Sequence, residues 1–92
     1  MKPEQAEMIG LQAVTWMIGN DELRDVFLGA SGLAEEDLRD GLGDPTFLGS
    51  VLEFICQDDA WVIGFSDANG LAYTDPMTAR NALPGGELVH WT

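Results

Sequence analysis

Residues that start and stop helices recur at short intervals, and they constrain the fold more than any other feature of this sequence. Asp44-Pro45 places a capping carboxylate directly before a proline, which is typical of a helix start. Ser31-Gly32-Leu33 and Asn69-Gly70-Leu71 each follow an apolar helical pattern with a glycine and a leucine. A glycine there can take the left-handed conformation that ends a helix, and the leucine can pack back on the last turn. The spacing of these signals predicts a series of short helices.

Between the signals, apolar residues recur at helical spacing, and no segment sustains the alternation of a strand. The expected helices span residues 3–18, 21–30, 35–41, 45–55, 58–68 and 75–83. We therefore predict an all-α fold, a compact orthogonal array of five to six short helices around the first and the fourth. Residues 1–92 are expected to form a single domain, in which 84–92 is an extended C-terminal tail folded back on the core.

The helical spacing also predicts which side chains face the core. The first helix carries apolar residues on most of its circumference and is expected to be nearly surrounded. Gly10 and Gly64 are expected to let the first and fifth helices approach closely. The expected inward residues are Ala6, Ile9, Leu11, Ala13, Val14, Trp16, Met17, Ile18, Leu23, Val26, Phe27, Ala30, Leu38, Leu42, Phe47, Leu48, Val51, Leu52, Ile55, Trp61, Val62, Phe65 and Ala68.

The tail is too apolar for a free chain end, because it carries Leu88, Val89 and Trp91. Two interpretations stay open. The tail folds over a groove between helices and buries Val89 and Trp91, or it docks elsewhere as a peptide.

A faint internal repeat relates residues 20–37 to residues 58–75, which agree at seven of eighteen positions. The shared positions include Phe27 with Phe65, and Asp37 with Asp75. They also include the Gly-Leu-Ala steps at 32–34 and 70–72. Two explanations stay open: one local solution used twice, because helix-ending signals converge readily, or duplication of a helical hairpin.

The chain is strongly acidic, with sixteen carboxylates against four cations and a formal net charge of −12. Such a charge repels phosphate backbones and anionic membrane surfaces, so we expect neither nucleic acid nor membrane as a partner. Many carboxylates fall near helix starts, where the helix dipole stabilises them. The acidic surface is therefore either a solvated face or a patch for a basic partner.

The N-terminal region and the cysteine content predict a cytoplasmic protein. Glu4 and Glu7 stand where a signal peptide would carry positive charge, and no stretch has the roughly 20 apolar residues of a membrane span. Cys56 is the only cysteine, so no disulfide can form within the chain, as suits a reducing compartment.

Candidate metal and catalytic sites fail on their spacing, so we expect no metal, no cofactor and no enzymatic activity. A calcium loop built on Gly70 as its sixth residue would need ligands at Phe65 and Pro76. Zinc lacks ligands, because the chain has one cysteine and one histidine. Cys56 with His90 is the one nucleophile–base pair to consider, but nearby carboxylates disfavour a thiolate there.

Several of these motifs together resemble a family of short, uncharacterised bacterial proteins, a domain-of-unknown-function family. The resemblance implies a compact helical fold and transfers no catalytic residue, substrate or cofactor. It covers most of the chain and is carried by the turn at Leu33, by Asp44-Pro45 with Phe47-Leu48 and Val51-Leu52, and by Pro84-Gly85-Gly86 with His90-Trp91-Thr92.

The function that the sequence favours is a non-catalytic, acidic helical module for protein–protein interaction, as a monomer or weak homodimer. The alternative is a small-molecule-binding or catalytic role in an apolar pocket between helices, which requires roughly 300 Å³ and convergent polar groups. A third hypothesis, a DNA mimic, requires carboxylates spaced like phosphates. The candidate partner-binding residues are Glu35, Glu36, Asp37, Asp40, His90 and Trp91.

Overall fold

The computed structural model describes residues 1–84 and contains six α-helices joined by short turns. No strand occurs in that part of the chain, so the predicted all-α fold is confirmed. The third predicted helix ends one residue early and continues as a 3-10 turn. The helices are α1 (Pro3–Ile18), α2 (Asp21–Ser31), α3 (Glu35–Asp40), the 3-10 turn η1 (Gly41–Gly43), α4 (Pro45–Ile55), α5 (Asp59–Asn69) and α6 (Asp75–Ala82).

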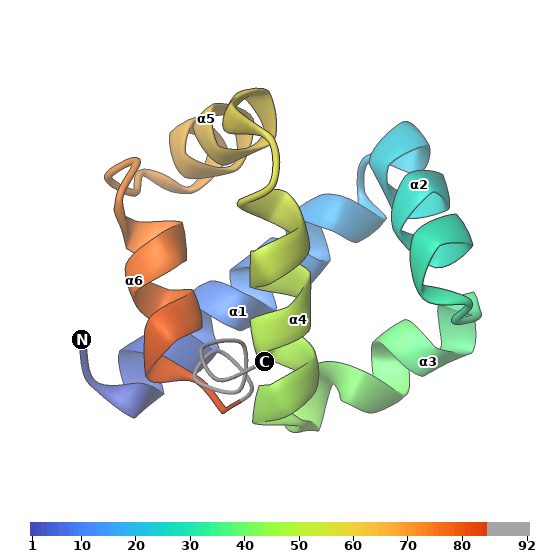
Figure 1. The fold of residues 1–92 in the computed structure, drawn as a ribbon, viewed down its shortest axis with the longest axis horizontal. Helices are drawn as coiled ribbons and strands as arrows, with labels where there is room; N and C mark the ends of the chain where they lie inside the picture. Colours follow the sequence, from blue (N-terminus) through green and yellow to red (C-terminus); the bar gives the residue numbers. More distant parts are fainter. Residues whose placement is uncertain (85–92) are drawn as a thin grey trace.

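Three helices form the centre of the molecule: α1, α4 and α6 pack against one another (Figure 1). The remaining helices lie around them, with α2 and α3 on one side and α5 at one end. Arg80 of α6 donates a hydrogen bond of 2.8 Å to Glu53 of α4, and this ion pair ties the two helices together. The predicted central position of α1 and α4 is confirmed.

Gly10 marks a close helix crossing, but its partner is α4 rather than the predicted α5. A Cβ atom at Gly10 would lie 2.8 Å from Cβ of Leu48. Gly64 does approach α1, where a Cβ would lie 3.3 Å from the ring of Trp16. The two glycines therefore serve separate crossings, because α1 is long enough to contact α4 and α5 at different turns.

Local hydrogen bonds account for the helix boundaries. Asn20, Asp44 and Asp58 each cap the following helix through a side-chain oxygen that accepts from a backbone N–H. Gly32 and Gly70 end α2 and α5 with φ of 75° and 67°, and within the described chain only these two residues have positive φ. The predicted left-handed helix ends are confirmed.

The core draws on every α-helix, and several expected inward residues are exposed instead. The α1 helix is not surrounded, because Leu11 is 40% exposed and the neighbouring Met8 is 63% exposed. Val26, Ala30, Leu42 and Ala68 are also exposed. Peripheral helices have a neighbour on one side only, so a narrow stripe of each is covered. The buried apolar residues are Ala6, Ile9, Ala13, Val14, Met17, Leu23, Phe27, Leu38, Leu48, Val51, Leu52, Phe54, Ile55, Phe65, Ala79 and Leu83.

The predictions made for the C-terminal tail, including the burial of Val89 and Trp91, concern residues outside the described range. The same holds for His90 as a partner-binding residue. None of the helices within residues 1–84 has the length and apolar composition that crossing a membrane requires.

Candidate functional site

The segment of α2 and α3, residues 21–40, is strongly acidic, and we term it the acidic flank. It contains seven carboxylates and two arginines, so its formal net charge is −5 over twenty residues. Arg24 lies within ion-pair distance of three of these carboxylates, at 3.3 Å from Asp21, 3.8 Å from Asp25 and 3.3 Å from Glu35. One cation is thus shared among three acidic side chains, and the flank stays negative.

The structure separates the four acidic candidates of this flank into two kinds. Glu35 pairs with Arg24, and Asp37 accepts a hydrogen bond of 2.9 Å from the backbone N–H of Ala34 at the start of α3. Glu36 and Asp40 are exposed, and neither has an ion pair or a side-chain hydrogen bond within residues 1–84. Residues four apart share a face of a helix, so Glu36 and Asp40 lie together on a solvent-exposed face of α3.

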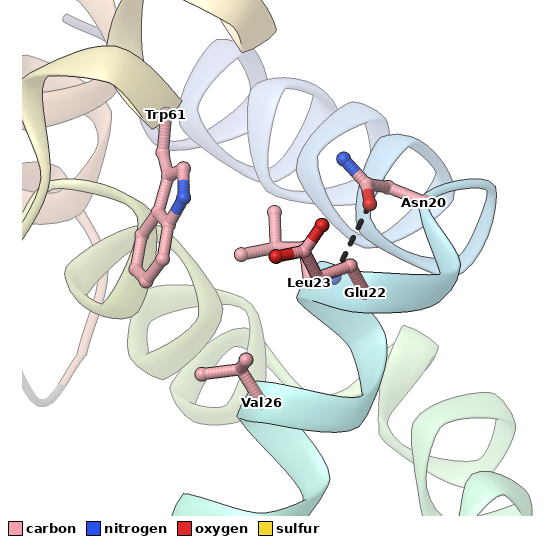
Figure 2. Close-up of a pocket in the computed structure, with 5 residues that line it drawn as sticks. All are labelled: Asn20, Glu22, Leu23, Val26 and Trp61. Carbon is pink, nitrogen blue, oxygen red and sulfur yellow. Dashed lines mark hydrogen bonds between the residues drawn. The ribbon is translucent and has the colours of Figure 1, made fainter.

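A small pocket opens between α2 and α5, with a volume of about 150 Å³ (Figure 2). Its walls are the indole of Trp61 on α5 and the side chains of Leu23 and Val26 on α2, with Asn20 and Glu22 at the start of α2. Figure 2 shows the indole nitrogen on the edge of Trp61 that faces the Glu22 carboxylate across the pocket. The pocket therefore combines an aromatic wall, an aliphatic wall and one acidic group.

A chain of aromatic contacts holds Trp61 in place. The rings of Phe54 and Trp61 lie 4.8 Å apart between centroids and are tilted by 31°. Phe54 in turn meets Phe27 edge-on at 5.1 Å, and Phe27 meets Phe47 at 6.3 Å. Such pairs add to the free energy of burial and fix ring orientation. These aromatic contacts therefore fix the position of the indole at the edge of the pocket.

A larger groove lies on α1 beside the turn that follows α5, with a volume of about 320 Å³. Met8, Ile9 and Leu71 give it an apolar surface. Its polar side chains, Glu4, Gln5 and Gln12, all belong to α1 and so stand on one wall. The groove has the size expected for a small ligand, but it does not bring polar groups together from different helices.

Cys56 is half-buried and follows the last residue of α4. Burial is the main cause that raises the pKa of its thiol; Glu53 raises it further and Arg80 opposes the shift. The thiolate is therefore disfavoured at neutral pH. The sequence predicts this direction from nearby carboxylates, but burial contributes more than Glu53 does. Within the described chain, no group of three or more His, Cys, Asp or Glu side chains is placed to hold a metal ion.

The sequence does not predict this pocket. Glu22 lies in the first turn of α2, where a carboxylate has a structural role, and Val26 and Trp61 are among the residues expected to face the core. The structure leaves Val26 45% exposed and Trp61 half-buried, and both line the pocket between α2 and α5. No sequence pattern relates Glu22 to Trp61, which is thirty-nine positions further along the chain.

Comparison with known proteins finds no match among curated proteins or among solved structures. A family model, described as a protein of unknown function, does match residues 3–86, nearly the whole chain. The predicted resemblance to an all-helical family of unknown function is thereby confirmed. On this match, the chain belongs to the DUF3572 family.

Proposed function

We propose that this chain is a non-catalytic interaction module that binds a basic segment of a partner protein along the acidic flank. The observation that carries the proposal is the net charge of −5 on residues 21–40, where Arg24 alone is shared by three carboxylates. Glu22, Glu36 and Asp40 have no ion pair or cap within the described chain, so they are available to cations of a partner.

The negative charge of the acidic flank affects both the rate and the specificity of binding. A concentrated negative surface accelerates encounter with a basic partner and disfavours acidic competitors. Exposed ion pairs contribute little individually, about 0.2–1 kcal/mol, so affinity from this flank requires several contacts at once. The raised pKa of the Cys56 thiol supports the non-catalytic part of the proposal, since a cysteine nucleophile acts as the thiolate.

The test begins with capture of partners from the source cell on the full-length chain, followed by binding measurements on the purified partner. Raising the salt concentration from about 50 to 300 mM should weaken binding at least several-fold, because screening shortens the range of exposed charges. The double variant Glu36→Gln and Asp40→Asn should weaken binding at low salt. The double variant Glu4→Gln and Glu7→Gln removes the same charge from α1 and serves as its control.

The proposal fails if the partner binds equally well at both salt concentrations. It also fails if the two double variants behave alike, because the loss would then reflect net charge and not the acidic flank.

A further inference from the structure

Two polar groups that face the pocket between α2 and α5 have no partner within the described chain. The Glu22 carboxylate makes no ion pair there, although Asp21 and Asp25 on either side of Arg24 do. Trp61 Nε1 donates no hydrogen bond there, and Figure 2 places it on the edge that faces Glu22. A carboxylate and an N–H group thus look across a space of about 150 Å³.

The size of the pocket restricts what can enter. Pockets for whole small-molecule ligands usually enclose about 300–1,000 Å³, so this one suits a single side chain or a group of similar size. Leu23 and Val26 supply an aliphatic wall, and Val26 is 45% exposed, a large value for a valine on a helix that contributes to the core. An occupant should therefore carry methylene groups as well as a polar end.

We propose that this pocket binds one arginine side chain of the basic partner segment. The inference rests on the proposed function and identifies the contact that would give it specificity. A planar guanidinium can donate two parallel hydrogen bonds to the Glu22 carboxylate and can stack on an aromatic ring, whereas an ammonium group offers neither geometry. The methylene stem of arginine suits the wall formed by Leu23 and Val26.

The indole N–H has a place in the same arrangement. It requires an acceptor, and a guanidinium has none, so the backbone carbonyl of the bound segment is the matching group. Phe54 packs against the indole at 4.8 Å between ring centroids, so the orientation of Trp61 is set before binding. A preorganised group loses little side-chain entropy on binding.

The experiment uses the full 92-residue chain, labelled with ¹⁵N, and a capped heptapeptide in which three arginines alternate with glycines. Two further peptides replace every arginine by lysine or by citrulline, the uncharged isostere. We expect the indole N–H resonance of Trp61 to shift on titration with the arginine peptide. We expect Glu22→Gln to raise Kd by about tenfold, the usual effect of losing a charged hydrogen-bonding partner.

The structure supplies matched controls for charge and for shape. Glu4 is the second residue of α1 as Glu22 is the second residue of α2, and both are exposed, so Glu4→Gln should change Kd by less than about twofold. Val26→Phe should block the pocket without altering charge. Ile63→Phe, at a position of equal 45% exposure on α5, should leave binding intact.

Three other results would contradict the arginine pocket, and each points to a different cause. If the arginine peptide binds but Glu22→Gln and Glu4→Gln have equal effects, the pocket is not the site, and the acidic flank still stands as the proposed function. If the lysine peptide binds as tightly as the arginine peptide, the pocket does not recognise the guanidinium group. If the arginine peptide fails to bind at low salt, the pocket is not an arginine site. The proposed function is then tested only by the measurements on the captured partner.

Discussion

Residues 20–37 and 58–75 start and end a helix in similar ways but pack against different neighbours. In both segments an eleven-residue helix starts at a side-chain cap and ends at a glycine with positive φ. In both, the alanine two residues beyond that glycine donates its N–H to an aspartate three residues later, at 2.9 Å to Asp37 and 3.0 Å to Asp75. The agreement follows from short-range contacts, and it is expected whether the repeat arose by duplication or by convergence.

The two turns differ at the leucine that follows the glycine. The N–H of Leu71 donates to the carbonyl of Ser66, which is the longer of the two bonds of a Schellman motif at the end of α5. The N–H of Leu33 donates instead to Oγ of Ser31. The first turn therefore relies on a serine side chain where the second relies on the helix backbone.

The larger difference lies in packing. Phe27 meets Phe47 and Phe54 beside α4, whereas Phe65 meets Trp16 on α1 at 5.7 Å. Equivalent positions therefore face different neighbours, and those neighbours set the environment of each side chain. A shared local pattern therefore fixes where a helix stops and leaves open what the helix packs against.

The largest expected effect comes from the two equivalent phenylalanines. Phe65 is fully buried and Phe27 is 5% exposed, so Phe65→Ala and Phe27→Ala should each lower the free energy of unfolding by about 3–5 kcal/mol. We expect the larger loss at Phe65, where the central helix α1 closes over the ring. Urea unfolding followed by circular dichroism measures both, and a larger loss at Phe27 would reverse the ranking of the two environments.

Substitution of the two helix-ending glycines tests the shared part of the comparison. Gly32→Val and Gly70→Val should each destabilise the protein by about 1–2 kcal/mol, because a β-branched residue is strained at positive φ. Gly29→Val is the matched control inside α2, where a Cβ meets nothing within 4 Å, and we expect a change below about 0.5 kcal/mol. Thermal unfolding that ranks Gly29→Val with the other two would show that left-handed strain is not the cause.

The two equivalent aspartates test whether the shared hydrogen bonds have equal value. Asp37→Ala and Asp75→Ala each remove the acceptor for an alanine N–H, with an expected loss of about 0.5–2 kcal/mol. Asp40→Ala removes an exposed carboxylate without such a bond and should change stability less. A loss at one aspartate and none at the other, measured by urea unfolding, would contradict the equivalence of the two turns.

The smallest expected effect is a gain in stability, at a buried serine that belongs to only one of the two segments. Ser66 is fully buried, and its hydroxyl has no hydrogen-bond partner within the described chain. Ser66→Ala should therefore raise the free energy of unfolding by about 1 kcal/mol, since an unsatisfied buried hydroxyl carries a desolvation cost. Ser50→Ala removes an exposed hydroxyl bonded to the carbonyl of Phe47 and should be nearly neutral. A destabilised Ser66→Ala protein would show that the hydroxyl has a partner.

Helix boundaries and the acidic character could be read from the sequence because each depends on residues close together in the chain. Asn20, Asp44 and Asp58 act within three residues of themselves, and the glycines at 32 and 70 act within four. Depth of burial could not be read in the same way. Phe54 falls outside the expected core face, yet it is buried between Phe27 and Trp61.

Where the helices begin and end and how negative the chain is follow from the sequence alone, because capping, left-handed glycines and formal charge are local properties. The crossing of Gly10 with α4, the exposure of Val26 and the pocket shared by Glu22 and Trp61 are set by tertiary packing. These outcomes depend on which helices become neighbours. That choice is made by the packing of the whole core, to which every α-helix contributes.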